Sequence, residues 1–193
     1  MNEIKEKKIG RFEIETNKIR VSDPCYEKEC KYNGVIENVK DGTWKAKIVV
    51  FDEGDDWGHR IGYLVCSHED YIVDVQDSRG GWIREGFEVG VDSGQVAIVD
   101  DKYFKDNEVV KNTHRIGGDN NWPIAEDEPW YSICCDRTLS KDSAGLIPFG
   151  AVSSSGYGDG VYDCYSLTKD GKIVAVYVDF GLENEENEEG EED

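Results

Sequence analysis

Short apolar stretches separated by turn residues recur along most of this chain. Residues 12–15 alternate apolar and polar side chains, as a strand with one buried face does. Similar stretches, each ended by Gly, Asp, Asn or Pro, continue as far as Phe180. We expect strands at 12–15, 19–21, 35–39, 44–51, 61–66, 71–75, 82–84, 87–91, 96–99, 130–135, 146–153, 161–167 and 173–180. Strands this short and closely spaced predict a mainly β fold, an antiparallel sandwich or barrel.

Two local signals add to this pattern. Asp-Gly dipeptides at 41–42 and 170–171 are typical of hairpin turns, and each should join the strands that flank it. One minor helix is expected at 100–112, where Asp100 or Asp101 can cap the start and apolar side chains follow at roughly helical spacing.

Length and composition predict one folded domain followed by a charged tail. A chain of 193 residues with 5 Trp, 10 Tyr and 6 Phe can bury a core without disulfide staples. We assign residues 1–181 to a single β-rich domain. Residues 182–193 are expected to be a disordered acidic tail, because residues 183–193 hold eight acids and no base.

The net charge of −20 restricts the partners. A surface of this sign repels the phosphates of nucleic acids and anionic lipids, so neither direct nucleic-acid binding nor membrane association is expected. No apolar run approaches the ~20 residues of a membrane span. A small-molecule ligand, a cation or a basic protein suits this charge.

Six cysteines raise the question of disulfides. They are Cys25, Cys30, Cys66, Cys134, Cys135 and Cys164. The first eleven residues are charged and contain no apolar leader segment, so a cytoplasmic location and reduced thiols are expected.

Two turn-rich segments carry candidate chemistry in the first half of the chain. In Ser-Asp-Pro-Cys-Tyr, Asp23 either closes an Asx turn or binds a cation or a ligand hydroxyl, with Cys25 as a nearby thiol. A nucleophilic Cys25 would need a histidine or a cation beside it, and no local spacing supplies one. In Val-Asp-Ser-Gly, Asp92 and Ser93 either form a hairpin turn or present a carboxylate and a hydroxyl at the end of a strand.

A third segment, Ser-Ser-Ser-Gly-Tyr-Gly-Asp-Gly-Val-Tyr at 153–162, is the richest in candidate ligands. Its glycine amides can form an anion-binding concavity, Asp159 can hold a cation, or the whole can be a hairpin turn. It lacks the Gly-Lys-Ser/Thr of a phosphate-binding P-loop. Ser155 and Tyr162 are its remaining candidate site residues.

Other signatures are weak or absent. The acidic loop at 52–56 lacks the spacing, central Gly and terminal Glu of an EF-hand. There is no Cys-x-x-Cys zinc motif and no Gly-x-Ser-x-Gly of a hydrolase, and the adjacent Cys134 and Cys135 would face opposite sides of a strand. We therefore assign no cofactor. A divalent cation, held by the candidate carboxylates, remains a possible ligand.

The order of the three segments resembles an uncharacterised bacterial and phage family, a domain of unknown function that starts with Asp-Pro-Cys-Tyr and closes with Gly-Asp-Gly-x-Tyr. The resemblance spans about residues 19–180 and leaves out the acidic tail. It implies a β-rich intracellular domain and supplies no activity.

These observations favour a ligand- or partner-binding module over an enzyme. We expect Asp23, Asp92 and Asp159 to converge with Ser93 and Tyr162 on one pocket. One alternative is an acidic decoy that imitates nucleic acid and occupies a basic protein, as a phage anti-defence protein does. Another is a metal-assisted hydrolase built on the three carboxylates.

Overall fold

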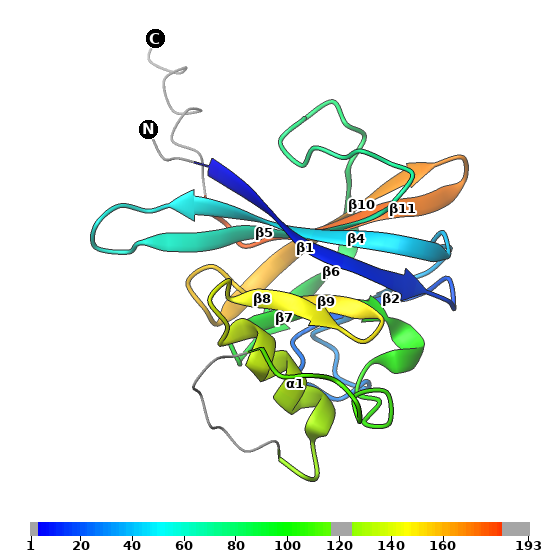
Figure 1. Ribbon diagram of the computed structural model, residues 1–193. Coiled ribbons are helices and arrows are strands. Elements are labelled where there is room, and N and C mark those ends of the chain that lie inside the picture. The colour runs from blue at the N-terminus through cyan, green and yellow to red at the C-terminus, as the bar shows by residue number, and fades with distance from the viewer. Residues whose placement is uncertain (1–3, 117–124, 183–193) are drawn as a thin grey trace.

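Two antiparallel sheets face each other in the computed structural model, which describes residues 4–116 and 125–182 (Figure 1). The six-stranded sheet has the order β1-β4-β5-β11-β10-β6. Its strands are β1 Ile4–Ile14, β4 Gly42–Asp52, β5 His59–His68, β6 Ile83–Val91, β10 Gly160–Lys169 and β11 Lys172–Asp179. The five-stranded sheet has the order β3-β2-β7-β9-β8. Its strands are β2 Ile19–Ser22, β3 Gly34–Ile36, β7 Gln95–Asp100, β8 Ala144–Ile147 and β9 Gly150–Ser154.

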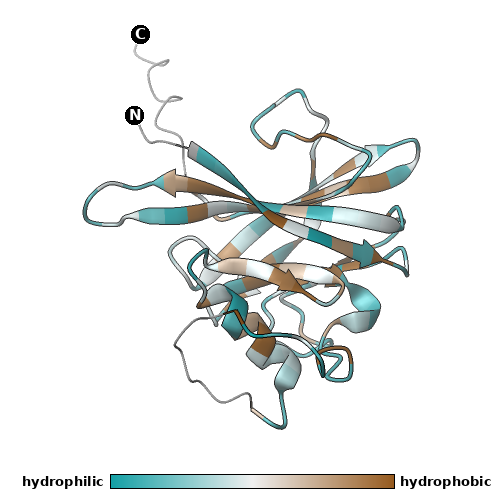
Figure 2. Cartoon of the chain, viewed as in Figure 1, coloured by the Kyte–Doolittle hydropathy of each residue, from teal (hydrophilic) through white to brown (hydrophobic). Residues whose placement is uncertain are grey.

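The expected mainly β, antiparallel sandwich is confirmed, and the described strands do not close into a barrel. The core lies between the sheets because alternate residues of each strand point inward. In β4, for example, Trp44, Ala46 and Ile48 are buried while the lysines between them face outward. Figure 2 shows this alternation as brown apolar residues interrupting teal polar ones along the strands.

The outer face of each sheet is also partly covered. A second apolar cluster, which includes Val65, Val73, Tyr177 and Leu182, forms on the outer face of the six-stranded sheet beneath the β5–β6 loop. Leu182, which was expected to belong to the acidic tail, is only 5% exposed there. The rest of the predicted tail lies outside the described residues, so its disorder stays a prediction.

The helix α1, Pro129–Thr138, covers the outer face of the five-stranded sheet (Figure 1). The strand expected at 130–135 is therefore wrong. Proline is well tolerated in the first turn of a helix, and Trp130, Ile133 and Cys134 bury one helical face against the sheet.

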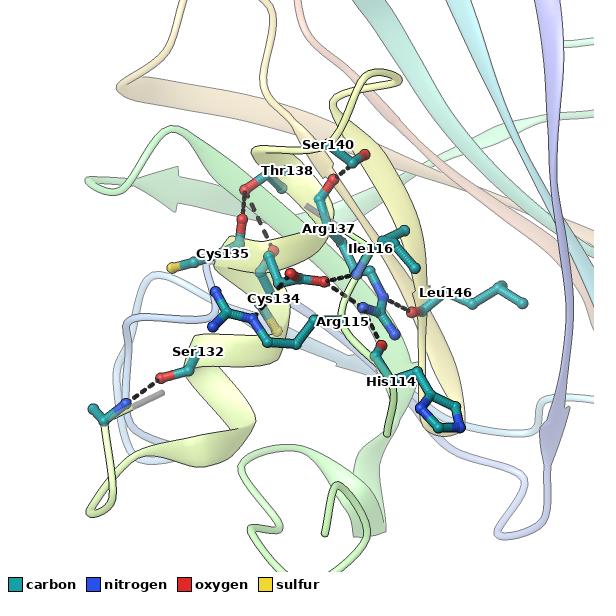
Figure 3. A network of polar contacts seen from close by, with 12 residues as sticks. His114, Arg115, Ile116, Ser132, Cys134, Cys135, Arg137, Thr138, Ser140 and Leu146 are labelled. Carbon is teal, nitrogen blue, oxygen red and sulfur yellow. Dashed lines mark hydrogen bonds and ion pairs between the residues drawn. The ribbon is translucent and has the colours of Figure 1, made fainter. Parts of the chain in front are cut away.

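A buried polar network holds α1 in place (Figure 3). Arg137 donates to the carbonyl of Leu146 in β8 over 2.7 Å and to the carbonyl of His114 over 2.9 Å. Its neighbour Asp136 pairs with Arg137 and accepts the amide of Ile116 over 2.8 Å. The network ties the helix both to the sheet and to the segment that follows β7.

The helix expected at 100–112 is wrong as well. The buried strand β7 runs on to Asp100, and only Asp101–Tyr103 form a short 3-10 turn, η1. Asp100 does cap that turn through the amide of Lys102, but its carboxylate also accepts the amides of Glu15 and Thr16. It therefore joins two distant segments rather than starting a long helix.

Several strand boundaries and pairings differ from expectation. The strands expected to form a hairpin around 41–42 belong to different sheets, since β3 pairs with β2 while β4 pairs with β1 and β5. Residues 83–91 form one strand rather than two, and 144–154 form two rather than one. The hairpin of β10 and β11 is confirmed. Within residues 4–116 and 125–182, no helix is both long and apolar enough to cross a membrane.

Candidate functional site

The three turn-rich segments lie at the same end of the sandwich. Ser22 pairs with Ala97, and Gln95 pairs with Ser154, so β2 ends where β7 begins and β9 ends. In the other sheet, the end of β6 pairs with the start of β10. The connections 92–94 and 155–159 each cross there from one sheet to the other. We call the surface formed by residues 23–33, 92–94 and 155–159 the turn end.

Asp23 joins the first two segments from a fully buried position. One carboxylate oxygen, Oδ1, accepts the amide of Cys25 over 2.8 Å and the hydroxyl of Ser93 over 2.6 Å. The other, Oδ2, accepts the amides of Asp92 over 2.8 Å and Ser93 over 2.7 Å. With both oxygens occupied by protein donors, Asp23 fixes the geometry of the turn end rather than facing a ligand.

The third segment is tied to the second through the main chain. The amide of Ser155 donates to the carbonyl of Gly94 over 3.1 Å. The phenol of Tyr162 closes the turn by donating to the carbonyls of Ser155 and Gly158 over 3.1 and 2.7 Å. Gly156 has φ +59, and a Cβ there would lie 3.1 Å from Phe180, so this tight turn needs glycine.

Asp159 does not join the other two carboxylates. Its side chain is exposed, and no described contact links it to Asp23 or Asp92. Its charge does reach Tyr162: burial raises the pKa of that phenol, and Asp159 adds to the rise. Among the described residues there is no group of three or more His, Cys, Asp or Glu side chains placed to hold a metal ion.

Helix α1 contributes residues that were not predicted from the sequence. Tyr131 lies near Cys25 and Ser93 and also contacts Cys135, one helical turn further along α1. Gln95, at the start of β7, links the 92–94 turn to α1. Its side-chain amide donates to the hydroxyl of Ser93 over 3.4 Å and to the thiol of Cys135 over 3.5 Å. The assignment of 130–135 to a strand hid this contact, because residues four apart are neighbours on a helix but lie about 13 Å apart along a strand.

Tyr26 is a second missed residue. Its phenol donates to Oδ2 of Asp92 over 2.6 Å, which holds that exposed carboxylate at the turn end. Burial, followed by this bond to Asp92, raises the pKa of Tyr26. Tyr26 is the last residue of the Ser-Asp-Pro-Cys-Tyr motif, and its place in that motif could have identified it as a candidate site residue.

Two ionisable groups near Asp23, the thiol of Cys25 and the phenol of Tyr131, are held in their neutral forms. Burial and the adjacent Asp23 raise the pKa of the Cys25 thiol to about 12. Burial, followed by Cys135, raises the pKa of Tyr131. These groups therefore serve as hydrogen-bonding groups near neutral pH, and Cys25 is not an activated nucleophile, which requires a lowered pKa. All six cysteines carry free thiols in the structure.

A family model described as a protein of unknown function (DUF4241) matches residues 12–178. The chain belongs to this family. The match covers all three segments of the turn end and excludes residues 179–193. Neither the search of curated proteins nor that of solved structures found a match.

Exposed aromatic side chains border the turn end in this DUF4241 protein. Trp57, from the β4–β5 connection, meets Tyr157 edge to face with ring centroids 5.5 Å apart. These side chains are 59% and 52% exposed. The phenol of Tyr157 donates to Glu53 over 2.6 Å, and Arg60 lies over its ring. The predicted acidic loop at 52–56 therefore packs beside the third segment.

Proposed function

We propose that this DUF4241 protein is a binding module whose ligand or protein partner binds at the turn end. One observation carries the proposal: three segments that are far apart in sequence are bonded together there through Asp23 and the Ser155–Gly94 contact. A buried carboxylate that orders two loops is typical of a preorganised site, and binding to an ordered site costs less entropy.

The chemistry of the surface indicates what it recognises. Asp92 is exposed and charged, while Cys25, Ser93 and Tyr131 offer neutral hydrogen-bonding groups beside it. Such a set suits an amine or guanidinium on the ligand, flanked by polar groups. A basic side chain of a protein partner and a small cationic molecule share this chemistry.

The aromatic border adds apolar contact. Exposed Trp and Tyr side chains are enriched in the binding surfaces of proteins because they bury a large area with little loss of side-chain freedom. Trp57 and Tyr157 supply such an area next to the acidic groups. A basic and partly apolar partner fits both features, and the free thiols suit a reducing compartment such as the cytoplasm.

Binding suits the geometry better than either metal-assisted hydrolysis or cysteine chemistry. The carboxylates of Asp23 and Asp159 differ in their surroundings: both oxygens of Asp23 accept hydrogen bonds from the protein, whereas Asp159 is exposed. This arrangement does not favour a metal site shared by the two. The raised pKa of Cys25 works against nucleophilic attack near neutral pH.

The test compares Asp92→Asn with a matched control, Asp170→Asn. Asp170 is exposed in the β10–β11 turn at the other end of the sandwich, and its φ of +51 is one that Asn adopts readily. Each tagged protein is purified from the same host, and mass spectrometry identifies the small molecules and proteins that accompany it.

Wild-type protein and the control should carry the same species, and Asp92→Asn should lose it about tenfold or more. This size follows because a hydrogen bond to a charged group contributes about 1.5–3 kcal/mol. Thermal unfolding should show that both variants fold. Equal recovery of the species from all three proteins would remove the turn end as the binding surface.

A further inference from the structure

A cavity with a basic lining lies on the outer face of the six-stranded sheet, away from the turn end. Its volume is about 440 Å³, and it is bounded by β1, β4, β5 and the loop that follows β5. Its charged lining residues are Lys8, Arg11, Lys45, Lys47 and Glu6. Four bases against one acid form an unusual surface in a chain whose net charge is −20.

The strand register sets basic residues directly opposite each other. Lys8 pairs with Lys47, and Arg11 pairs with Lys45, across β1 and β4. Like charges at directly opposite positions of an antiparallel pair destabilise the sheet. Two adjacent pairs of this kind therefore carry a local cost that a bound anion would offset.

A β-bulge brings the two pairs to the same face. The register of β1 shifts between Lys8 and Gly10, which inserts one extra residue. Without it, Lys8 and Arg11 would point to opposite faces, since side chains alternate along a strand. Gly10 has φ +151, and a Cβ there would lie 2.6 Å from Leu146, so the bulge needs glycine.

Two of these four basic side chains already have an acidic partner within the protein. Lys47 donates to Glu6 over 2.6 Å and to the carbonyl of Val73 over 3.2 Å, and Arg11 lies 3.7 Å from Glu69. Within the described part of the chain, neither Lys8 nor Lys45 has an ion-pair partner. Two cationic side chains in one cavity are thus available to a ligand.

We infer that this cavity binds a small molecule that carries a polyvalent oxyanion, such as a diphosphate or a tricarboxylate. Lys8 and Lys45 supply the charge, and Arg11 adds a planar donor pair of the geometry that suits carboxylate and phosphate. Ile72, which is 99% exposed, and Val73 offer an apolar wall for an organic body. The site is independent of the turn end and shares no residue with it.

The test is calorimetric titration of the full chain with pyrophosphate and, separately, with citrate at low ionic strength. The variant is the double substitution Lys8→Gln with Lys45→Gln, which keeps most of each aliphatic stem. The control is Lys169→Gln with Lys172→Gln. Those lysines also face each other across two strands and are exposed, but they lie at the β10–β11 turn and do not line the cavity.

One of the two anions should bind wild-type protein and the control at a one-to-one ratio. The cavity variant should bind it about tenfold more weakly or worse, and added salt should weaken all binding. Tighter binding of pyrophosphate would identify a phosphoryl ligand, and tighter binding of citrate a carboxylate ligand. Absence of binding to wild-type protein, or an equal loss in the control, would overturn the inference.

Discussion

At the scale of single residues, Asp23 shows what a sequence predicts and where prediction stops. An Asp before Pro favours an Asx turn, and Asp23 does accept the amide of Cys25 two residues later. Its bonds to Asp92 and Ser93 reach 69 and 70 residues along the chain. No local pattern predicts them, because they depend on the order of the strands in both sheets.

Replacing Asp23 with Ala should therefore destabilise the fold. The substitution removes four accepted hydrogen bonds and leaves three backbone amides and a hydroxyl without their partner. The expected loss in the free energy of unfolding is about 3 kcal/mol or more, measured by urea denaturation. Asp159→Ala is the control, because that exposed side chain should cost less than about 0.5 kcal/mol. Similar midpoints for the two variants would show that Asp23 does not hold the turn end together.

At the scale of elements, helix α1 was hidden by its composition. Trp, Tyr, Ile and Cys at 130–135 are typical of strands, yet the buried residues Trp130, Ile133, Cys134 and Arg137 follow the helical spacing of three and four. This spacing is one of burial, and the sequence alone does not show it, because half-buried Tyr131 and Cys135 are as apolar as the residues that face the sheet. At 41–42 the Asp-Gly signal was misleading, since Gly42 already begins β4, and β3 and β4 belong to different sheets.

The attachment of α1 is open to a direct test with Asp136→Ala. This carboxylate is buried against Arg137 and accepts the amide of Ile116, so its loss leaves a buried guanidinium without that partner. Removing one partner of a buried pair costs about 3–5 kcal/mol. Urea denaturation followed by tryptophan fluorescence, which reports on buried Trp130, measures the change. The exposed Glu126→Ala serves as control, and an unchanged midpoint for Asp136→Ala would show that the network is dispensable.

At the scale of the whole molecule, the class of fold was predictable, but the geometry of the turn end and the basic cavity were not. Short strands with Gly and Asp turns are enough to indicate an antiparallel sandwich. The turn end needs the strand order, which sets 92–94 beside 155–159. The basic cavity depends on a one-residue bulge in β1. The alternation of apolar and polar residues in the sequence does not predict this bulge. Local motifs identified candidate residues of the turn end, but long-range register sets the geometry of both sites.

The buried thiols and phenols together predict how the whole fold responds to alkali. Burial raises the pKa of Cys66, Cys134 and Cys164 from the ordinary value of 9.0, and raises that of Tyr63 from 10.0 to about 12. Between about pH 9 and about 12 the unfolded chain has released protons that the folded chain keeps, so stability falls as pH rises. The stabilisation is fully present below about pH 9.

Urea denaturation in reductant should give a constant midpoint from neutral pH to about pH 9 and a falling midpoint above it. Self-repulsion in a chain of charge −20 also grows with pH, but salt screens repulsion between exposed charges and barely affects the ionisation of buried thiols. The fall should therefore persist in high salt. A decline that salt abolishes would assign it to surface charge, and a flat midpoint to about pH 11 would show that these groups titrate alike in the folded and unfolded chain.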